Sequence, residues 1–193
     1  MKRMQKKTII TIAGRPGSGK STTSKGIAAE LGYQHFSSGD LFRAIAHERG
    51  IDLMQANLVA EKETEIDHLV DKRLRDIGEL ESEVVIDSRL AWHWMPNSFK
   101  VYLNLDLQVA AVRILAHMDA TRLESEQVHS DPKEYAAALQ ERLDIEARRY
   151  KSLYDVNPYD EKNYDLVVDT AVNNPEQVRA LIIERYQLWL NEQ

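Results

Sequence analysis

Gly14-Arg-Pro-Gly-Ser-Gly-Lys-Ser21 is the stretch of sequence that determines the fold. It fits a pattern of glycine, four residues of any kind and then Gly-Lys-Ser, which is typical of loops that bind nucleotide phosphates. Glycines let the backbone turn its N–H groups toward phosphate oxygens, and Lys20 can reach the outer phosphates of a nucleoside triphosphate, while Ser21 is placed to bind magnesium. The predicted nucleotide-binding residues are those of the loop and the next position: Gly14, Arg15, Pro16, Gly17, Ser18, Gly19, Lys20, Ser21 and Thr22.

The residues on both sides of the loop have the periodicity that this motif requires. Thr8–Ala13 is a β-branched apolar run, and Lys20–Leu31 has helical spacing and stops at Gly32. Strand, loop and helix therefore follow in the right order, which disfavours a glycine-rich turn with a chance Gly-Lys-Ser. The loop alone is shared by kinases, hydrolases and switch proteins, so it does not decide the reaction.

Further strands and helices are predicted along the rest of the chain. Four short runs read as strands, at 33–36, 83–87, 99–104 and 166–168, and helices are expected over 38–47, 53–77 and 132–154 and directly after Asp106. Five strands separated by helices, with few hairpin signals, predict an α/β fold with a parallel sheet covered on both faces. The polar segment 118–132 lacks periodicity and is predicted to be a mobile excursion from the core.

Composition limits the expected cellular compartment and the kind of binding partner. A chain of 193 residues with 43% hydrophobic residues predicts one globular domain. Cysteine is absent, which excludes disulfides and thiolate nucleophiles and favours a reducing, cytoplasmic compartment. The net charge of -6 argues against a protein that binds nucleic acid, and no run approaches membrane-spanning length. The expected partner is a small molecule.

Two candidate site residues lie at the end of the third predicted strand and just beyond it. Asp87 ends that strand, and the carboxyl ends of parallel strands open onto the crevice that holds the phosphate loop. Asp87 could therefore hold magnesium through water; the alternative is a carboxylate that caps the strand end. Arg89 is expected to point into the same cleft. Arg43 is as well explained by a solvated surface arginine, and the six histidines show no metal-ligand spacing, so no zinc site is predicted.

Several motifs fall together in one order along the chain. Besides the loop, they are Ser38-Gly-Asp-Leu-Phe-Arg43, Val84-Val-Ile-Asp-Ser-Arg-Leu90, Arg142 with Glu146 and Arg149-Tyr150, and Tyr164-Asp-Leu-Val-Val-Asp-Thr170. From Thr8 to about Ile183 the chain resembles a cytidylate kinase of the short, archaeal-type branch. The resemblance implies a P-loop kinase fold that transfers the γ-phosphate of ATP, with Mg2+, to CMP or dCMP. It also implies a monophosphate-binding helical region at about 37–80 and a mobile lid at about 118–135.

The resemblance also implies roles for single residues. Those expected on the monophosphate side are Ser38, Asp40, Arg43 and Arg89. Lid-side arginines at the transferring phosphoryl group would be Arg142 and Arg149, which join Lys20 and Asp87 as the expected catalytic set. The two lid-side arginines are seven residues apart and hence on one helix face, and arginine suits phosphoryl groups through its planar donors. The alternative for both is pairing with Glu146 at the surface.

The chain departs from the family pattern at three places. Asp87 stands where glutamate is usual, Trp92 where a small glycine is expected, and His117 where the family tends to have arginine. Core packing is the expected use of Trp92. Two alternatives stay open: a small-metabolite kinase on a similar core, and a non-catalytic nucleotide-binding regulatory protein with a decayed lid. The chain is expected to act as a monomer on nucleotides, without nucleic-acid or membrane partners.

Overall fold

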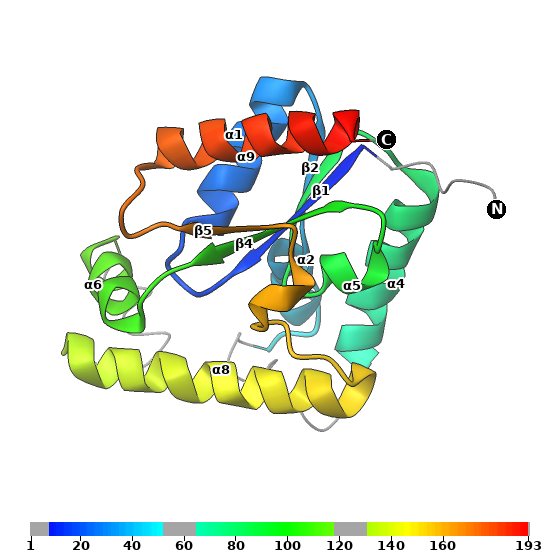
Figure 1. Cartoon of the computed structure of the whole chain (residues 1–193). Helices are drawn as coiled ribbons and strands as arrows, with labels where there is room; N and C mark the ends of the chain where they lie inside the picture. Colours follow the sequence, from blue (N-terminus) through cyan, green and yellow to red (C-terminus); the bar gives the residue numbers. More distant parts are fainter. Residues whose placement is uncertain (1–7, 52–64, 118–130, 193) are drawn as a thin grey trace.

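The computed structural model describes residues 8–51, 65–117 and 131–192. Within them, five strands form one all-parallel sheet in the order β2-β3-β1-β4-β5 (Figure 1). The strands are β1 (Ile9–Gly14), β2 (Gln34–Ser37), β3 (Val84–Asp87), β4 (Phe99–Asn104) and β5 (Leu166–Asp169). The predicted α/β fold with a five-stranded parallel sheet is confirmed, because each buried strand reads in the sequence as a short apolar run.

Helices cover both faces of this sheet. They are α1 (Lys20–Leu31), α2 (Ser38–Glu48), α4 (Glu65–Leu80), α5 (Ala91–Trp94), α6 (Leu107–His117), α8 (Pro132–Tyr154) and α9 (Pro175–Asn191), with a short 3-10 helix at Glu161–Asn163. None of the helices in the described ranges is long and apolar enough to cross a membrane. The first part of the helix expected over 53–77 and most of the lid expected at 118–135 lie outside the described residues.

Alternation along β1 divides the core into two layers. Ile10 and Ile12 face α1 and α9, which run together over one face of the sheet (Figure 1). Ile9 faces the other way, where it packs with residues of α4 and α5 such as Leu74 and Met95. Successive strand side chains point to opposite faces, so one strand with a continuous apolar sequence serves both layers.

A third apolar cluster joins α6 to α8. Ala110 and Ala111 of α6 pack against Tyr135 and Leu139 of α8. In Figure 1, α8 runs along the bottom of the view with α6 beside one of its ends. This contact fixes the long helix that carries the two predicted lid-side arginines relative to the end of β4.

The turn after β1 requires glycine. Gly14 has φ +150°, and a Cβ atom there would lie 2.3 Å from the backbone oxygen of Leu103 on β4. Gly19, just before α1, has φ +82°, in the left-handed region that favours glycine. The strand order places this turn between β3 and β4, which lie on either side of β1, and such a position is where open α/β sheets bind ligands.

Two helices were not predicted from the sequence. The short α5 follows β3, and α9 forms the end of the described chain. The start of α9 carries a capping box, in which Asn174 and Gln177 each accept a hydrogen bond from the backbone N–H of the other, and Pro175 occupies the first helical position.

Candidate active site

The phosphate loop is held closed by its own backbone and by β4. The backbone N–H of Arg15 donates to Leu103 O at 3.1 Å, and the Ser18 hydroxyl donates to Arg15 O at 2.7 Å. Lys20 Nζ donates to the same carbonyl oxygen at 3.0 Å. Gly19 offers no capping side chain to α1, so the N–H groups at the start of this helix remain available to an anion.

Lys20 is less basic than an ordinary lysine. Burial of its ammonium, followed by repulsion from Arg89, lowers the pKa of Lys20 to about 8, although Asp87 and Glu146 oppose the shift. A cation whose charge is disfavoured by its surroundings gains most when an anion is placed beside it. This side chain is therefore prepared to receive phosphate oxygens.

The two predicted magnesium-binding residues are in contact. Ser21 Oγ donates a hydrogen bond to Asp87 Oδ2 at 2.6 Å, and Asp87 is only 6% exposed at the end of β3. Mg2+ prefers hard oxygen ligands and commonly binds through one or two protein side chains together with water and substrate phosphates. A hydroxyl and a carboxylate side by side at the start of α1 fit such an ion.

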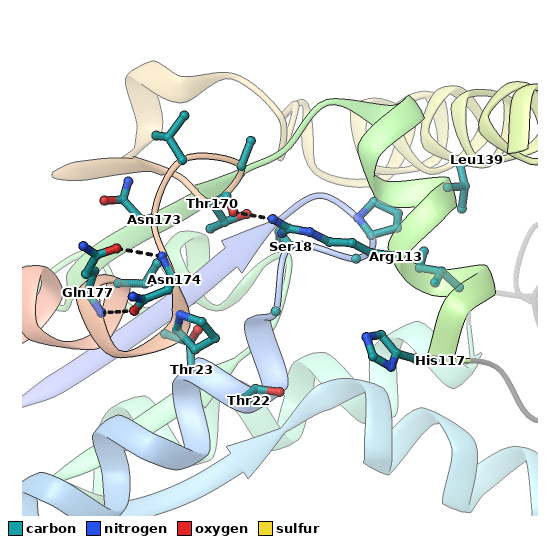
Figure 2. Close-up of a pocket in the computed structure, with 18 of the residues that line it drawn as sticks. Ser18, Thr22, Thr23, Arg113, His117, Leu139, Thr170, Asn173, Asn174 and Gln177 are labelled. Atoms are coloured by element: carbon teal, nitrogen blue, oxygen red, sulfur yellow. Dashed lines mark hydrogen bonds between the residues drawn. The ribbon is translucent and has the colours of Figure 1, made fainter.

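The larger of the two cavities at this edge of the sheet has a volume of about 1020 Å³. Residues 16–19 of the loop line it, as do Arg113 and His117 of α6 and the segment 170–178 between β5 and α9 (Figure 2). Arg113 donates to the backbone oxygen of Thr170 at 2.8 Å and so ties α6 to the end of β5. We call this space the large cavity.

The small cavity, with a volume of about 230 Å³, lies on the other side of the loop. Most of the residues predicted for catalysis, for magnesium and for the monophosphate line it, namely Lys20, Ser21, Ser38, Arg43, Asp87, Arg89, Arg142 and Arg149. Two of them, Arg89 and Arg142, line the large cavity as well. The two cavities therefore meet at this pair of arginines.

A buried carboxylate, Glu146, joins these two arginines. Glu146 Oε2 lies 2.8 Å from Arg89 Nε, and Glu146 Oε1 accepts from Arg142 Nε at 3.1 Å. Tyr159 also donates its hydroxyl to Glu146 Oε2, at 2.5 Å. Burial alone would raise the pKa of Glu146, but Arg89 and Arg142 outweigh burial and hold that pKa below its usual value. Pairing of Arg142 with Glu146 thus occurs, but it joins an exposed arginine to a buried carboxylate rather than two surface side chains.

Arg149 lies deeper in the small cavity and does not line the large one. Its Nε is 3.6 Å from Asp67 Oδ2 of α4, and its Nη2 donates to the Tyr150 hydroxyl at 3.3 Å. The neighbouring Arg148 is exposed and lines neither cavity. Of the two adjacent arginines, the structure brings Arg149 into the cleft.

Some predicted residues lie elsewhere. Asp40 lines neither cavity; its backbone N–H donates to Ser37 Oγ at the start of α2, and its exposed carboxylate pairs with Arg43. The Arg15 side chain turns away to Leu105 O, at 3.4 Å. Trp92 also lines neither cavity: its Nε1 donates to Arg89 O at 2.9 Å, and its ring packs at 5.7 Å from that of Tyr164.

Sequence comparison finds relatives that cover most of the chain. A family model described as an AAA domain matches residues 13–135. The cytidylate kinase of Natronomonas pharaonis is 38% identical over 177 residues, covering 90% of this chain and 86% of the relative. That of Haloarcula marismortui is 40% identical over 179 residues, covering 91% of this chain and 87% of the relative.

Solved structures confirm the fold. A shikimate kinase from Bacteroides thetaiotaomicron superposes with a TM-score of 0.63 at 17% identity, covering 94% of this chain and 98% of that one. At this identity the likeness concerns the P-loop kinase fold alone, whereas the much higher identity to the two cytidylate kinases concerns the family. The chain belongs to the AAA domain family and, with its P-loop kinase fold, to the family of the archaeal cytidylate kinases.

Proposed function

We propose that this protein transfers the γ-phosphate of ATP to CMP or dCMP, giving ADP and CDP or dCDP. One observation carries the proposal: two cavities, one lined by the phosphate loop and one by the predicted monophosphate residues, meet at Arg89 and Arg142. A phosphoryl group that passes between two bound nucleotides needs such a shared, positively charged point. The relatives named as cytidylate kinases support pyrimidine monophosphate as the acceptor.

On the donor side, the phosphate loop would bind ATP. The open N-terminus of α1 and the loop N–H groups would bind the phosphates, and Lys20 would neutralise charge on the outer ones. The large cavity then has room for the rest of the nucleotide, between α6 and the segment that follows β5. Ser21 and Asp87 would hold Mg2+, which when bound neutralises phosphate charge.

On the acceptor side, Ser38, Arg43 and Arg89 would bind the phosphate of the monophosphate. They line the small cavity from α2 and from the segment after β3. Arg43 is more than half exposed and reaches in from the rim, whereas Arg89 is fixed by the Glu146 carboxylate. Asp40 would act through its ion pair with Arg43 rather than by touching the nucleotide.

Phosphoryl transfer asks the protein mainly for fixed positive charge, because charge spreads over the moving group in the transition state. Glu146 holds the guanidinium groups of Arg89 and Arg142 in place before any nucleotide binds. Charges fixed in advance cost no reorganisation during the reaction. Arg149 would act from the lid side, and closure over the two nucleotides would exclude water.

Two other functions compete with this one. A small-metabolite kinase would share the fold, and shikimate kinase and gluconokinase structures do share it. The identity of 38–40% to cytidylate kinases over about 90% of the chain favours the nucleotide kinase. A non-catalytic protein with a decayed lid is disfavoured because Lys20, Arg89 and Arg142 are all in place at the cleft. A single domain, a monomeric state, a cytoplasmic setting and the absence of a nucleic-acid partner stay predictions.

The proposal is tested by an assay that couples ADP release to absorbance, with CMP, dCMP, UMP, AMP, GMP and shikimate as acceptors. We expect turnover with CMP and dCMP that exceeds turnover with the purine nucleotides and shikimate. The Lys20→Met variant is the matched control for contaminating kinases. Turnover with shikimate alone, or ATP binding without transfer to any acceptor, would contradict the proposal in favour of one of the two alternatives.

A further inference from the structure

Asp67 is a buried acid in the small cavity that the reaction described above does not use. It is the third residue of α4, and its side chain is only 9% exposed. Its Oδ2 atom accepts no hydrogen bond within the described part of the chain. The Nε–H of Arg149 lies 3.6 Å from this atom and finds no acceptor among the described residues either. Leaving a buried polar group without a hydrogen bond costs stability, so each such group requires an explanation.

The cavity has two chemically different ends. Its phosphate end is fixed by Arg89 and Arg142, since these are the residues that it shares with the large cavity. Phe42 of α2 and Val70 of α4 line only the small cavity, as does Asp67. A nucleoside monophosphate whose phosphate lies between the shared arginines would place its base toward these three residues. An aromatic and a branched aliphatic side chain suit the faces of the base, which leaves the carboxylate for its polar edge.

The hydrogen-bonding pattern of the base determines whether a carboxylate can bind its polar edge. Cytosine carries an amino group at C4, which donates, whereas uracil carries an oxygen at the same place, which accepts. An ionised carboxylate only accepts. Burial raises the pKa of the Asp67 carboxyl, and the charge of Arg149 offsets only part of this rise. The Arg149 guanidinium, with Nε 3.6 Å from Asp67 Oδ2, is the group that would balance an ionised carboxylate here. An ionised Asp67 therefore finds a hydrogen-bond donor in cytosine, whereas uracil would place a second acceptor opposite it.

We propose that Asp67 determines base specificity by accepting a hydrogen bond from the 4-amino group of the cytosine ring. The inference rests on the proposed function, because it needs a pyrimidine monophosphate in the small cavity. In this proposal Arg149 has a second role, because the ion pair between its Nε and Asp67 Oδ2 orients the Asp67 carboxylate. The competing explanation is that Asp67 only positions Arg149 and contacts no nucleotide.

The test combines one protein variant with one altered substrate. The protein change is Asp67→Asn, which keeps the shape and removes the charge. The substrate change is the monophosphate of the pyrimidin-2-one ribonucleoside, which is CMP without its 4-amino group. CMP, this 4-deamino analogue and UMP are compared by their kcat/KM values and by their Kd values, which calorimetry measures without ATP. The matched control is Asp71→Asn, one turn further along α4, because Asp71 is equally buried but accepts from Trp94 Nε1 and the Tyr154 hydroxyl and lines neither cavity.

In the unmodified protein, removing the 4-amino group should lower kcat/KM by about 10- to 100-fold, as expected for a hydrogen bond to a charged group. In Asp67→Asn this penalty should shrink at least fivefold, and the preference for CMP over UMP should fall by about the same factor, while Asp71→Asn keeps both. Calorimetry should show the same change in Kd ratios. A thermal melt checks folding, and the comparison of substrates within the unmodified protein does not depend on it.

If Asp67 only positions Arg149, the variant should lose activity equally with all three substrates and keep the penalty unchanged, which would overturn the inference and leave the proposed function intact. An unmodified protein that uses CMP and its 4-deamino analogue equally well would also overturn it. Failure of the unmodified protein to phosphorylate any pyrimidine monophosphate is a different result, which refutes the proposed function and the inference together.

Discussion

Replacing Lys20 by methionine should make the protein more stable while it abolishes phosphoryl transfer. The ammonium is held where its charge is disfavoured, because burial and then Arg89 lower the pKa of Lys20 to about 8 from an ordinary 10.5. Methionine has a similar length and no charge, so it fills the same space without that cost. Stability and activity should therefore change in opposite directions at this one position.

The size of the effect follows from the contacts of Lys20. The difference between 10.5 and about 8 corresponds to about 3 kcal/mol, since one pKa unit is worth about 1.4 kcal/mol. The lost hydrogen bond from Nζ to Arg15 O subtracts about 1 kcal/mol, and that carbonyl still accepts from Ser18 Oγ at 2.7 Å. A net gain of about 2 kcal/mol should raise the Tm by about 4–8 °C for a chain of this length.

The dependence of the gain on pH identifies its cause. The folded protein releases the Lys20 proton at about pH 8 and the unfolded chain only at about 10.5, so the unfolded state binds more protons between these values. The stability of the unmodified protein relative to the variant therefore rises over this range. Below about pH 8 the variant should have its full advantage, and by about pH 10.5 that advantage should be gone.

Urea unfolding at pH 7 and pH 10 measures both quantities. Lys25→Met is the matched control, because Lys25 is an exposed lysine of the same helix. We expect the control to change the free energy of unfolding by less than about 0.5 kcal/mol at either pH. A Lys20→Met protein that is less stable than the unmodified one at pH 7, or equally more stable at both pH values, would refute the reasoning.

Three further predictions concern the cleft. Asp87→Asn should raise the Mg2+ concentration needed for half-maximal turnover at least tenfold with little change in Tm, because its carboxylate faces Ser21 rather than the core; a large loss of Tm with normal Mg2+ dependence would indicate a capping role. Arg43→Ala should raise the KM for CMP about tenfold or more and leave the KM for ATP within about twofold, since Arg43 lines only the small cavity; equal changes would contradict this. Glu146→Gln should cost about 3 kcal/mol in urea unfolding, because it removes the buried carboxylate that compensates the partly buried Arg89 and the more exposed Arg142; a change below about 1 kcal/mol would show that the ion pairs add little.

The elements that the sequence predicted well are those with local end signals. The limits of α1 agree with the prediction because Gly19 and Gly32, with φ of +82° and +70°, mark its two ends. The long helix α8 starts where Asp131 accepts from the backbone and Pro132 takes the first helical position. α9 has equally clear signals in its capping box and proline, and these could have revealed it.

The contacts within the site depend on residues far apart in the chain, and no local pattern announces them. Glu146 and Arg142 have the spacing of an ordinary surface pair on a helix, and only the placement of α8, which packs on α6, brings Glu146 beside Arg89. Asp67 and Asp71 are both acids of one amphipathic helix, and the sequence offers no means to tell them apart. The fold does so by placing one in the cavity and the other against Trp94.

The charge balance at the meeting point of the cavities links the stability of the protein to its binding of phosphate. Three cations, Lys20, Arg89 and Arg142, gather there with two carboxylates, Asp87 and Glu146, which leaves an excess of one positive charge in a chain whose net charge is -6. Burial of the Lys20 ammonium, followed by repulsion from Arg89, depresses the pKa of Lys20, and the excess positive charge attracts phosphate oxygens. The buried Lys20 ammonium destabilises the free protein and also attracts phosphates, so a bound nucleotide both completes the reaction site and compensates this buried charge.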